Sequence, residues 1–319
     1  MFNYNDVRDA YDRIQGKVFR TPLHKSIFLG NDKMNCYYKM ESLQPVKSFK
    51  IRGAFNKLMS LTEVEKERGI VAISSGNHGI AVSYAAKILG IENVEIVVPF
   101  NTPKSKLRGI QHYGGVIKLI GENYDEAHNL GVAYVEDQKK TYIDAYFDDE
   151  LIYAGQGTIA IEILEERPEV DTILVPIGGG GLITGIAVAA KAINPNVRII
   201  GIQPEACPAM LKAMEDHVFY ENYPSEDSIC EALVGGVGKL SYELAHTYID
   251  EIVLVSEKMI SQGVAHMVRN EKFVVEPSGA ICTGAILQYP NRDWGRNVVM
   301  VMTGGNIDGD LLLKILKNY

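Results

Sequence analysis

Four consecutive glycines form the strongest candidate for a ligand site in this chain. Gly178, Gly179, Gly180 and Gly181 follow the apolar stretch TILVPI and lead into the helical pattern LITGIAVAAKAI. Without Cβ atoms, the backbone there can turn sharply and aim N–H groups at an anion, helped by the positive end of the helix dipole. A tight strand-to-helix turn is the plainer interpretation, although one or two glycines would be enough for it. Because no Lys-Ser/Thr pair follows and the spacing departs from G-x-G-x-x-G, a simple phosphate ester is favoured over ATP or a dinucleotide.

A lysine at the start of another helical pattern supplies a second chemical group. Lys50 stands between two apolar residues in KSFKIRGAFNKL. Such a lysine is most often a solvated side chain, and Lys47, Arg52 and Lys57 are open to the same interpretation as surface charges. A lysine held among apolar groups, however, loses its charge more readily and can form a Schiff base with an aldehyde. A phosphate site together with an aldehyde-binding lysine indicates pyridoxal phosphate.

Polar groups also gather where two other apolar stretches end. The segment SSGNHG (74–79) follows IVAI, and its backbone N–H groups and side chains could hold a carboxylate. Ser74 or Ser75 could instead cap the next helix, and His78 is interpreted as a packed polar residue, because a lone histidine is weak evidence for catalysis. Thr303 follows NVVMVM and precedes Gly304-Gly305-Asn306; its hydroxyl could cap a turn or bond a ring nitrogen.

A looser glycine pattern appears at GQGTIA (155–160), which matches the dinucleotide fingerprint G-x-G-x-x-A. The preceding residues, DDELIYA, are not a clear apolar strand, so the required context is weak. We interpret this segment as the start of a helix. It keeps open a reading of the chain as a nonenzymatic small-molecule or dinucleotide-binding module.

The elements that position these groups alternate between two periodicities. Short β-branched runs predict strands at 70–74, 94–99, 115–120, 172–177, 197–203, 251–256 and 297–302, most of them buried on both faces. Amphipathic stretches between them are long enough to be crossovers between parallel neighbours. The pattern therefore predicts an α/β fold with mainly parallel sheets, in which ligands bind beyond the carboxyl ends of the strands.

Length and charge limit the class of protein. The chain has 319 residues, enough for about two domains of roughly 150 residues each. It carries 40 acidic and 32 basic residues, a formal net charge of −8, which opposes binding to nucleic acid or anionic lipid. We expect neither partner. Four separated cysteines without a C-x-x-C pair indicate neither a disulfide framework nor a zinc site, and with no export signal or membrane span we expect a cytoplasmic protein.

Six segments, in order, resemble the threonine/serine dehydratase and serine racemase family of fold-type II pyridoxal phosphate enzymes. They are ESLQPVKSFKIRGA, SSGNHG, AGQGTIAIEILEE, VPIGGGGLITGIA, VEPSGA and MTGGNID. The resemblance covers almost the whole chain and implies two open, mainly parallel sheets flanked by helices, as in the tryptophan synthase β-like fold. Since the chain ends soon after TGGNID, it looks like the short catabolic dehydratases, and feedback inhibition by isoleucine is not expected.

The resemblance assigns roles to the candidate residues. Lys50 would be the Schiff-base lysine, with Phe49 against the cofactor ring and Asn77 bonded to the phenolic oxygen. Thr303 would face the pyridine nitrogen. The glycines at 178–181 and the N–H of Leu182 would hold the phosphate.

The same family implies how substrate enters. Ser74, Ser75, Gly76, Asn77 and His78 would receive the substrate carboxylate. They would belong to a small mobile domain, 66–147, that closes over a large cofactor-binding domain made of 1–65 and 148–319. Closure would keep water from reactive species. A homodimer is also expected, on the family resemblance and the frequency of two-fold assemblies.

The implied activity is elimination of water from L-threonine, L-serine or a related β-hydroxy amino acid, giving a 2-oxo acid and ammonia. Lys50 would remove the α-proton. A hydroxyl at Thr303 would not stabilise a protonated pyridine as a carboxylate does, so the carbanion should be short-lived and expel the β-hydroxyl.

Departures from the family keep a racemase open as the alternative. Ser75 matches the racemases, in which the corresponding serine protonates the opposite face, whereas many dehydratases carry alanine. Position 303 is threonine where serine or cysteine is commoner. Against racemisation, Gln203, Cys207 and Ala209 occupy the stretch where racemases hold a divalent ion, and no metal site is expected. The segments CEALVGGVG (230–238) and AYF (145–147) also differ from usual dehydratases, which leaves the substrate's side chain undetermined.

Overall fold

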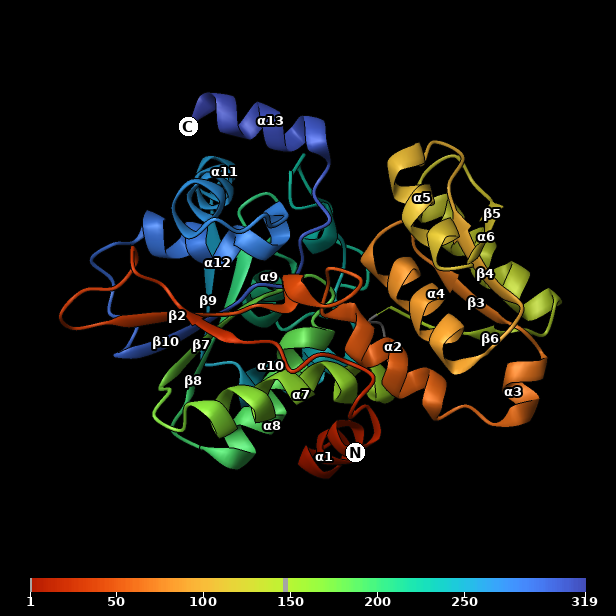
Figure 1. Ribbon diagram of the computed structural model, residues 1–319, viewed down its shortest axis with the longest axis horizontal. Coiled ribbons are helices and arrows are strands. Elements are labelled where there is room, and N and C mark those ends of the chain that lie inside the picture. Colours follow the sequence, from red (N-terminus) through yellow and green to blue (C-terminus); the bar gives the residue numbers. More distant parts are fainter. Residues whose placement is uncertain (1, 146–148) are drawn as a thin grey trace.

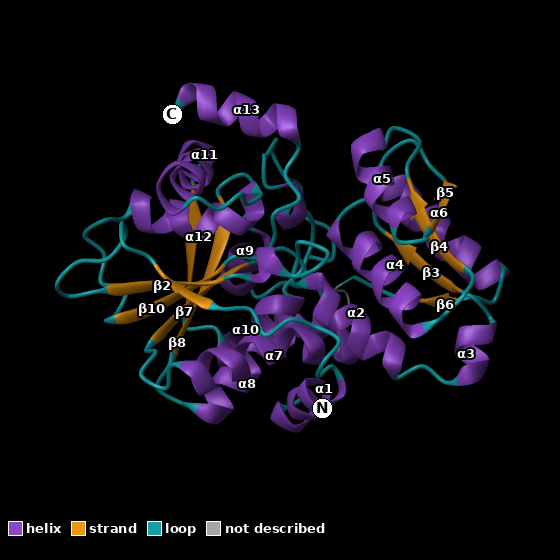
Figure 2. Ribbon diagram, in the orientation of Figure 1, coloured by secondary structure: helices purple, strands orange, loops and turns teal. Residues whose placement is uncertain are grey.

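The chain forms two β-sheets, each covered by helices, in a computed structural model that describes residues 2–145 and 149–319 (Figures 1 and 2). Within those residues one sheet has six strands and the other has four. Both sheets are mainly parallel, which confirms the α/β fold expected from the alternating sequence patterns.

The six-stranded sheet has the order β1-β2-β10-β7-β8-β9, and only β1 and β2 pair antiparallel. Its strands are β1 (Leu23–Lys25), β2 (Asn35–Lys39), β7 (Thr172–Pro176), β8 (Arg198–Pro204), β9 (Glu251–Val255) and β10 (Asn297–Val301). The chain runs from β7 outward to β8 and β9, then returns to form β10 on the other side of β7. The order of the strands therefore reverses between β7 and β10, and in open α/β sheets ligands bind beyond the carboxyl ends of such a pair.

Helices cover both faces of this sheet (Figure 1). One face carries α1 (Tyr4–Arg13), α7 (Glu150–Glu166), α8 (Gly181–Ile193) and α10 (Lys239–Tyr248), and the other carries α11 (Glu257–His266), α12 (Pro277–Gln288) and α13 (Gly309–Asn318). A π-helical turn, Met267–Glu271, follows α11, while α9 (Ala209–Asp216) follows β8. Two clusters of buried apolar residues flank this sheet, a large one on the α7 and α8 side and a second beneath α11 and α12.

The four-stranded sheet is parallel throughout, with the order β5-β4-β3-β6. Its strands are β3 (Ile70–Ile73), β4 (Val94–Val98), β5 (Val116–Leu119) and β6 (Thr141–Tyr142), and its helices are α3 (Glu63–Glu67), α4 (Asn77–Leu89), α5 (Lys104–His112) and α6 (Tyr124–Asp137). β3 is buried along its whole length because it lies between β4 and β6. β5, at the edge, keeps exposed residues at both ends.

Helix α2 (Lys50–Met59) connects the two layered units. It packs against α4 beside the small sheet and against α7 beside the large one, as Figure 1 shows. Because α2 begins at Lys50, its first residue lies where the two units meet.

The seven predicted strands are all present, each within a residue or two of the expected limits. The apolar runs did not reveal β1, β2 and β6. β2 reads NCYYK and ends on a lysine, Lys39, whose burial depends on a carboxylate far along the chain. β1 and β6 are too short for their periodicity to be seen.

The predicted helix start at 155–160 is wrong. α7 begins at Glu150, so Gly155 and Gly157 lie inside the helix. A Cβ at Gly155 would come within 2.6 Å of the carbonyl oxygen of Arg52, and one at Gly157 within 2.6 Å of that of Gly185. These glycines let α7 approach α2 and α8 closely, and the segment forms no dinucleotide-binding turn.

Candidate active site

The candidate active site is built around Lys50, the first residue of α2. Its Nζ donates a hydrogen bond to the backbone carbonyl of Ala145, 3.0 Å away, and lies 5.4 Å from the centre of the Phe49 ring. The side chain is only partly exposed, in contrast to the exposed Lys47 three residues earlier. Lys50 is therefore a sheltered amine beside an aromatic ring, and not the solvated side chain that is most common for such a lysine.

Burial lowers the pKa of Lys50 to about 8, while the negative charge of Asp144 acts in the opposite direction. An ordinary lysine has a pKa near 10.4, so its neutral form is scarce at physiological pH. At Lys50 a useful fraction of the amine is unprotonated. A neutral amine is the form that attacks an aldehyde or accepts a proton from carbon.

The four glycines lie at the carboxyl end of β7 and form the turn into α8. Gly180 is the residue before the helix and has φ of +95°, a conformation that favours glycine. A Cβ there would also come within 2.5 Å of Ser241. Gly178 and Gly181 are equally crowded, by the backbone of Ala232 and the ring of Tyr153. Protein packing thus explains these glycines in part.

The first turn of α8 supports an anion site. No side chain caps this end of the helix, so its N–H groups are not satisfied by a serine, threonine or carboxylate. Gly178 and Gly179 stay partly exposed, whereas Leu182 is buried. A backbone bond from the Gly238 N–H to the Gly179 carbonyl, 2.9 Å long, fixes the turn from its other side. A phosphate fits such a helix N-terminus.

Thr303 lies at the carboxyl end of β10, next to β7 in the sheet. The residue is buried, and its backbone carbonyl accepts a hydrogen bond from the Phe49 N–H at 3.0 Å. The backbone of Gly305 likewise donates to the carbonyl of Lys47 at 2.8 Å. The structure thus brings Thr303 to the residues that precede α2, which are more than 250 positions away in sequence.

The serine-rich loop lies between β3 and α4. Gly76, not a serine, is the residue before the helix, and no side chain caps it. The alternative that Ser74 or Ser75 caps α4 is therefore wrong. The Ser74 hydroxyl instead accepts a bond from the Gly76 N–H at 3.2 Å, and both serines remain partly exposed. Their hydroxyl groups are available to a ligand.

His78 is a packed polar residue, as expected from the sequence taken alone. Its side chain is buried and Nε2 lies 2.9 Å from the carbonyl oxygen of Ile143. Burial, and secondarily the charge of Lys50, lower the pKa of His78 to about 4. The imidazole is therefore neutral near pH 7, so any substrate contact of His78 would come without a positive charge.

Glu276 and Asn306, which the sequence did not single out, complete the site through their bonds to Asn77. Asn77 donates its side-chain Nδ2 to Glu276, 2.7 Å away, and accepts at Oδ1 from Nδ2 of Asn306, also at 2.7 Å. Glu276 and Asn306 lie in the quoted segments VEPSGA and TGGNID. Nothing in the local sequence of either segment distinguishes the two residues from their neighbours.

Arg52 contradicts the interpretation as a surface charge. Its side chain is fully buried, and its guanidinium makes bidentate pairs with Glu41 and with Glu162 at 2.7–2.8 Å. Lys39 donates to the same Glu162 at 2.6 Å. Burial acts to raise the pKa of Glu41, but the guanidinium of Arg52 outweighs it and the pKa is lowered. Two cations and two anions are thus paired beneath α2.

The other lysines near the site behave as the sequence suggests. Lys47 is exposed, and Lys57 pairs with Asp149 at 2.7 Å near the surface.

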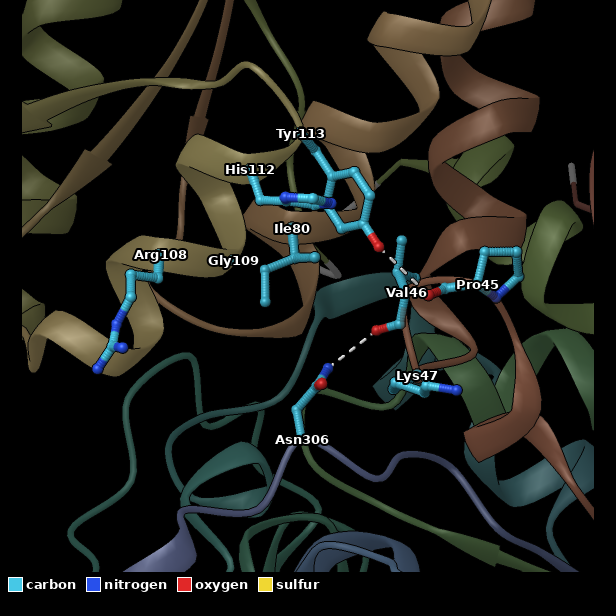
Figure 3. A pocket seen from close by; sticks show the side chains of 9 residues that line it. All are labelled: Pro45, Val46, Lys47, Ile80, Arg108, Gly109, His112, Tyr113 and Asn306. Atoms are coloured by element: carbon cyan, nitrogen blue, oxygen red, sulfur yellow. Dashed lines mark hydrogen bonds between the residues drawn. The ribbon is translucent and has the colours of Figure 1, made fainter.

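A cavity of about 550 Å³ opens beside the loop before α2 (Figure 3). Pro45, Val46 and Lys47 line one side, and the other is lined by Ile80 of α4 and by Tyr113, the residue that follows α5. The Tyr113 hydroxyl donates to the Pro45 carbonyl at 3.4 Å across it. Asn306, which also lines this cavity, links it to Asn77.

The residues at the racemase metal position are engaged in packing. Gln203 accepts the Leu211 N–H at 3.1 Å, and the Cys207 sulfur faces the Gly235 carbonyl at 3.5 Å. Across residues 2–145 and 149–319, no cluster of three or more His, Cys, Asp or Glu side chains is placed to hold a metal. Of the departure at 145–147, only Ala145 is among the described residues. Within the same part of the chain, no helix is long and apolar enough to cross a bilayer.

Comparison with known proteins agrees with this geometry. The model of the family described as "Pyridoxal-phosphate dependent enzyme" matches residues 14–304. The chain is 38% identical over 307 residues to the catabolic L-threonine dehydratase TdcB of Escherichia coli K12, covering 95% of this chain and 93% of that protein. It is 36% identical to the L-threonine ammonia-lyase of Thermotoga maritima, over 99% of this chain and 78% of the relative.

Solved structures give the same result. Maize serine racemase superposes with a TM-score of 0.91 at 32% identity, over 99% of this chain and 97% of that one. Threonine deaminase from tomato (Solanum lycopersicum) gives a TM-score of 0.90 at 30% identity, over 98% and 86%. A sheltered amine of lowered pKa and an uncapped helix start in a glycine turn are what an aldehyde bearing a phosphate ester requires, and the chain belongs to the family of pyridoxal-phosphate-dependent enzymes.

Proposed function

We propose that this enzyme eliminates water from L-threonine, L-serine or a related β-hydroxy amino acid and releases a 2-oxo acid and ammonia. The observation that carries the proposal is the lowered pKa of Lys50 in a chain so similar to a catabolic threonine dehydratase. The bound cofactor supplies an aldehyde that takes the substrate amino group and a ring that draws electrons from Cα.

Lys50 is the proposed base. Its neutral amine removes the proton on Cα, and the β-hydroxyl leaves with a proton as water. Hydrolysis of the carbon–nitrogen bond at Cα of the product then consumes one water and releases ammonia and the 2-oxo acid, so the reaction is balanced without an oxidant. The neighbouring Phe49 ring limits the water that reaches the amine.

The other site residues bind and orient. We assign the backbone of Gly178, Gly179, Gly180, Gly181 and Leu182 to the phosphate, because the uncapped start of α8 attracts an anion. The hydroxyl of Thr303, at the end of β10, is assigned to the ring nitrogen, which it leaves without a counter-charge.

The loop between β3 and α4 is assigned to the substrate carboxylate. The N–H groups at the start of α4 and the hydroxyls of Ser74 and Ser75 can donate to it, and Gly76 lets the backbone approach. Asn77 contributes to both the cofactor and this loop. His78 supports the loop through its bond to Ile143.

Residues 66–147 are proposed to move as a small domain against 1–65 and 148–319. The small sheet and its helices α4, α5 and α6 lie in this range, and side-chain bonds from it to the remainder include Asn77 to Glu276 and Lys106 to Glu231. Such a movement would close the site over the substrate. We further propose a cytoplasmic homodimer, which size-exclusion chromatography with light scattering and cell fractionation would test.

The function is tested by supplying purified enzyme, loaded with cofactor, with a panel of β-hydroxy amino acids. Ammonia and 2-oxo acid should appear in equal amounts from at least one of them. Absence of both products for threonine, serine, hydroxyaspartate and phenylserine would overturn the proposal.

Racemisation is the second candidate, because Ser75 lies on the loop assigned to the substrate and the fold matches maize serine racemase. A residue able to return a proton to the opposite face of Cα would invert the substrate. Chiral analysis of unreacted substrate in heavy water decides the question. Deuterium in the opposite enantiomer would support racemisation, and its absence would reject it as a main activity.

A further inference from the structure

We propose that Glu276 is a positioning residue that holds the side-chain amide of Asn77, leaving one Asn77 N–H directed to the cofactor. The inference rests on the proposed role of Asn77 at the cofactor. It concerns a carboxylate that the reaction proposed above does not use.

A continuous chain of hydrogen bonds ends on Glu276. Nδ2 of Asn306 donates to the carbonyl oxygen of Val46 at 2.9 Å and to Oδ1 of Asn77 at 2.7 Å. Nδ2 of Asn77 then donates to Oε1 of Glu276 at 2.7 Å. Four residues from four separate segments of the sequence are thereby joined in one line.

The direction of this chain is determined by the carbonyl of Val46. A backbone carbonyl only accepts, so the atom of Asn306 that faces it must be the amide nitrogen. That same nitrogen faces Asn77, which must therefore present its oxygen there and its nitrogen to Glu276. The orientation of the Asn77 amide is thus fixed whether Glu276 is ionised or protonated.

An amide nitrogen carries two hydrogens, and Glu276 takes only one from Asn77. The other remains for an acceptor in the site, such as the phenolic oxygen assigned to Asn77. If the carboxylate were absent, the Asn77 amide would be held only at its oxygen, by Asn306, and its nitrogen would lose the acceptor that keeps it in place. Glu276 acts through Asn77 in this scheme and need not touch the cofactor itself.

The surroundings show that the carboxylate is directed to Asn77 rather than to its own helix. Glu276 immediately precedes α12, where a side chain commonly caps the helix, yet it makes no capping bond. A Cβ at Gly304 would come within 2.2 Å of Oε1 of Glu276, so only glycine leaves room for the carboxylate there. The Glu276 N–H donates to the Gly304 carbonyl at 3.1 Å, which fixes the backbone as well.

The charge of Glu276 is a separate property. The side chain is buried, and burial raises the pKa of Glu276 to about 7, while the bond from Asn77 opposes that change. The negative charge of Glu231 raises the pKa of Glu276 and the positive charge of Lys106 lowers it, and the charge of Glu276 in turn acts on the thiol of Cys230. Glu276 therefore titrates near physiological pH, and its ionised form should favour a proton on a neighbouring group.

The test is a double-mutant cycle on cofactor affinity, measured by titrating apoprotein with pyridoxal phosphate and following visible absorbance. Glu276→Ala should weaken binding about tenfold, the loss expected for one hydrogen bond. In an Asn77→Ala background the same change should have little further effect, because its target is gone. An equal loss in both backgrounds would show that Glu276 does not act through Asn77.

Glu276→Gln keeps an acceptor but removes the charge. We expect affinity within about threefold of the wild type, together with a shift to lower pH in the absorbance titration of the bound cofactor. Unchanged affinity in Glu276→Ala and an unchanged titration in Glu276→Gln would overturn the proposal. If Glu276→Ala fails to fold, the absorbance titration of Glu276→Gln still tests the proposal.

Glu271→Gln is the matched control, since Glu271 is also buried but bonds Ser26, remote from the site. It should leave the cofactor's affinity and titration unchanged, and a similar response would indicate a general effect of removing a buried charge. Because no amino acid substrate is involved, the cycle remains readable if the proposed dehydration fails. Ammonia release by the wild type tests that function separately.

Discussion

The amine of Lys50 is hydrogen-bonded to the carbonyl of Ala145, which follows β6 of the small sheet, while Lys50 itself begins α2. The contact crosses from one layered unit to the other. Reaction of the amine with an aldehyde requires this bond to be given up, so the Lys50 side chain must turn away from the Ala145 carbonyl when the cofactor binds.

Replacement of Lys50 by alanine should abolish turnover. The variant loses both the covalent attachment point and the base, and we expect at least about a thousandfold loss of kcat. Borohydride treatment should trap no cofactor on the protein. Lys47→Ala removes an exposed lysine three residues away and should retain activity. Turnover by Lys50→Ala above a hundredth of the wild-type rate would contradict the assignment.

Attachment of cofactor to apoprotein should follow the titration of Lys50. The neutral amine attacks, so the rate should rise as pH increases through about 8 and then level off. An ordinary lysine would keep gaining reactivity to beyond pH 10. Stopped-flow absorbance across this range gives the midpoint.

Asp144→Asn offers a directional check on that profile. The carboxylate of Asp144 raises the pKa of Lys50, so its removal should move the midpoint to lower pH. His78, with a pKa of about 4, stays neutral over the range and should not add a second step. A midpoint that moved upward would show that Asp144 does not act on Lys50 as a charge.

Gly180→Ala should damage the glycine turn more than an isolated strained glycine would suggest. The new Cβ meets Ser241 at 2.5 Å and the backbone has φ of +95°. Strain and overpacking together predict a loss of about 2–4 kcal/mol in unfolding free energy. Gly16→Ala, with φ of +71° and nothing near its Cβ, isolates the strain. If urea unfolding gave equal losses of unfolding free energy for the two variants, the contact between the new Cβ at position 180 and Ser241 would contribute nothing to the loss.

Breaking the buried ion pairs should be costly to stability. Arg52→Leu leaves Glu41 and Glu162 with too few cations, and we expect a loss of about 3–5 kcal/mol in unfolding free energy. Lys212→Met removes one partner of the exposed pair with Glu215 and should have no measurable effect. Denaturant unfolding of both apoproteins makes the comparison, and similar midpoints would refute it.

Sequence patterns predicted the parts of the fold that depend on local periodicity. The strand β3 is one case, since IVAI is buried on both faces and bounded by polar residues. Short β1 and β6 carry too few residues for a pattern. Gly155 and Gly157 suggested a helix start because glycine is usual at turns, but the approach of α2 and α8 requires them inside α7.

Side-chain partners were beyond such patterns. Arg52 appears in the sequence as one more charge in a basic segment, and its partner Glu162 is 110 residues away. Nothing local distinguishes it from Lys47. Likewise Glu276 and Asn306 gain their meaning only when folding places them beside Asn77.

The guanidinium of Arg52 makes six hydrogen bonds just two residues after Lys50 in the same helix. The start of α2 is consequently held rigidly, whereas the Lys50 side chain that carries the reactive nitrogen remains flexible. Proton transfer can then be steered by rotation about the four methylene groups of one side chain, without any displacement of the helix that bears it. Differences in the size of the amino acid accepted should accordingly arise from the loop between β3 and α4 rather than from α2.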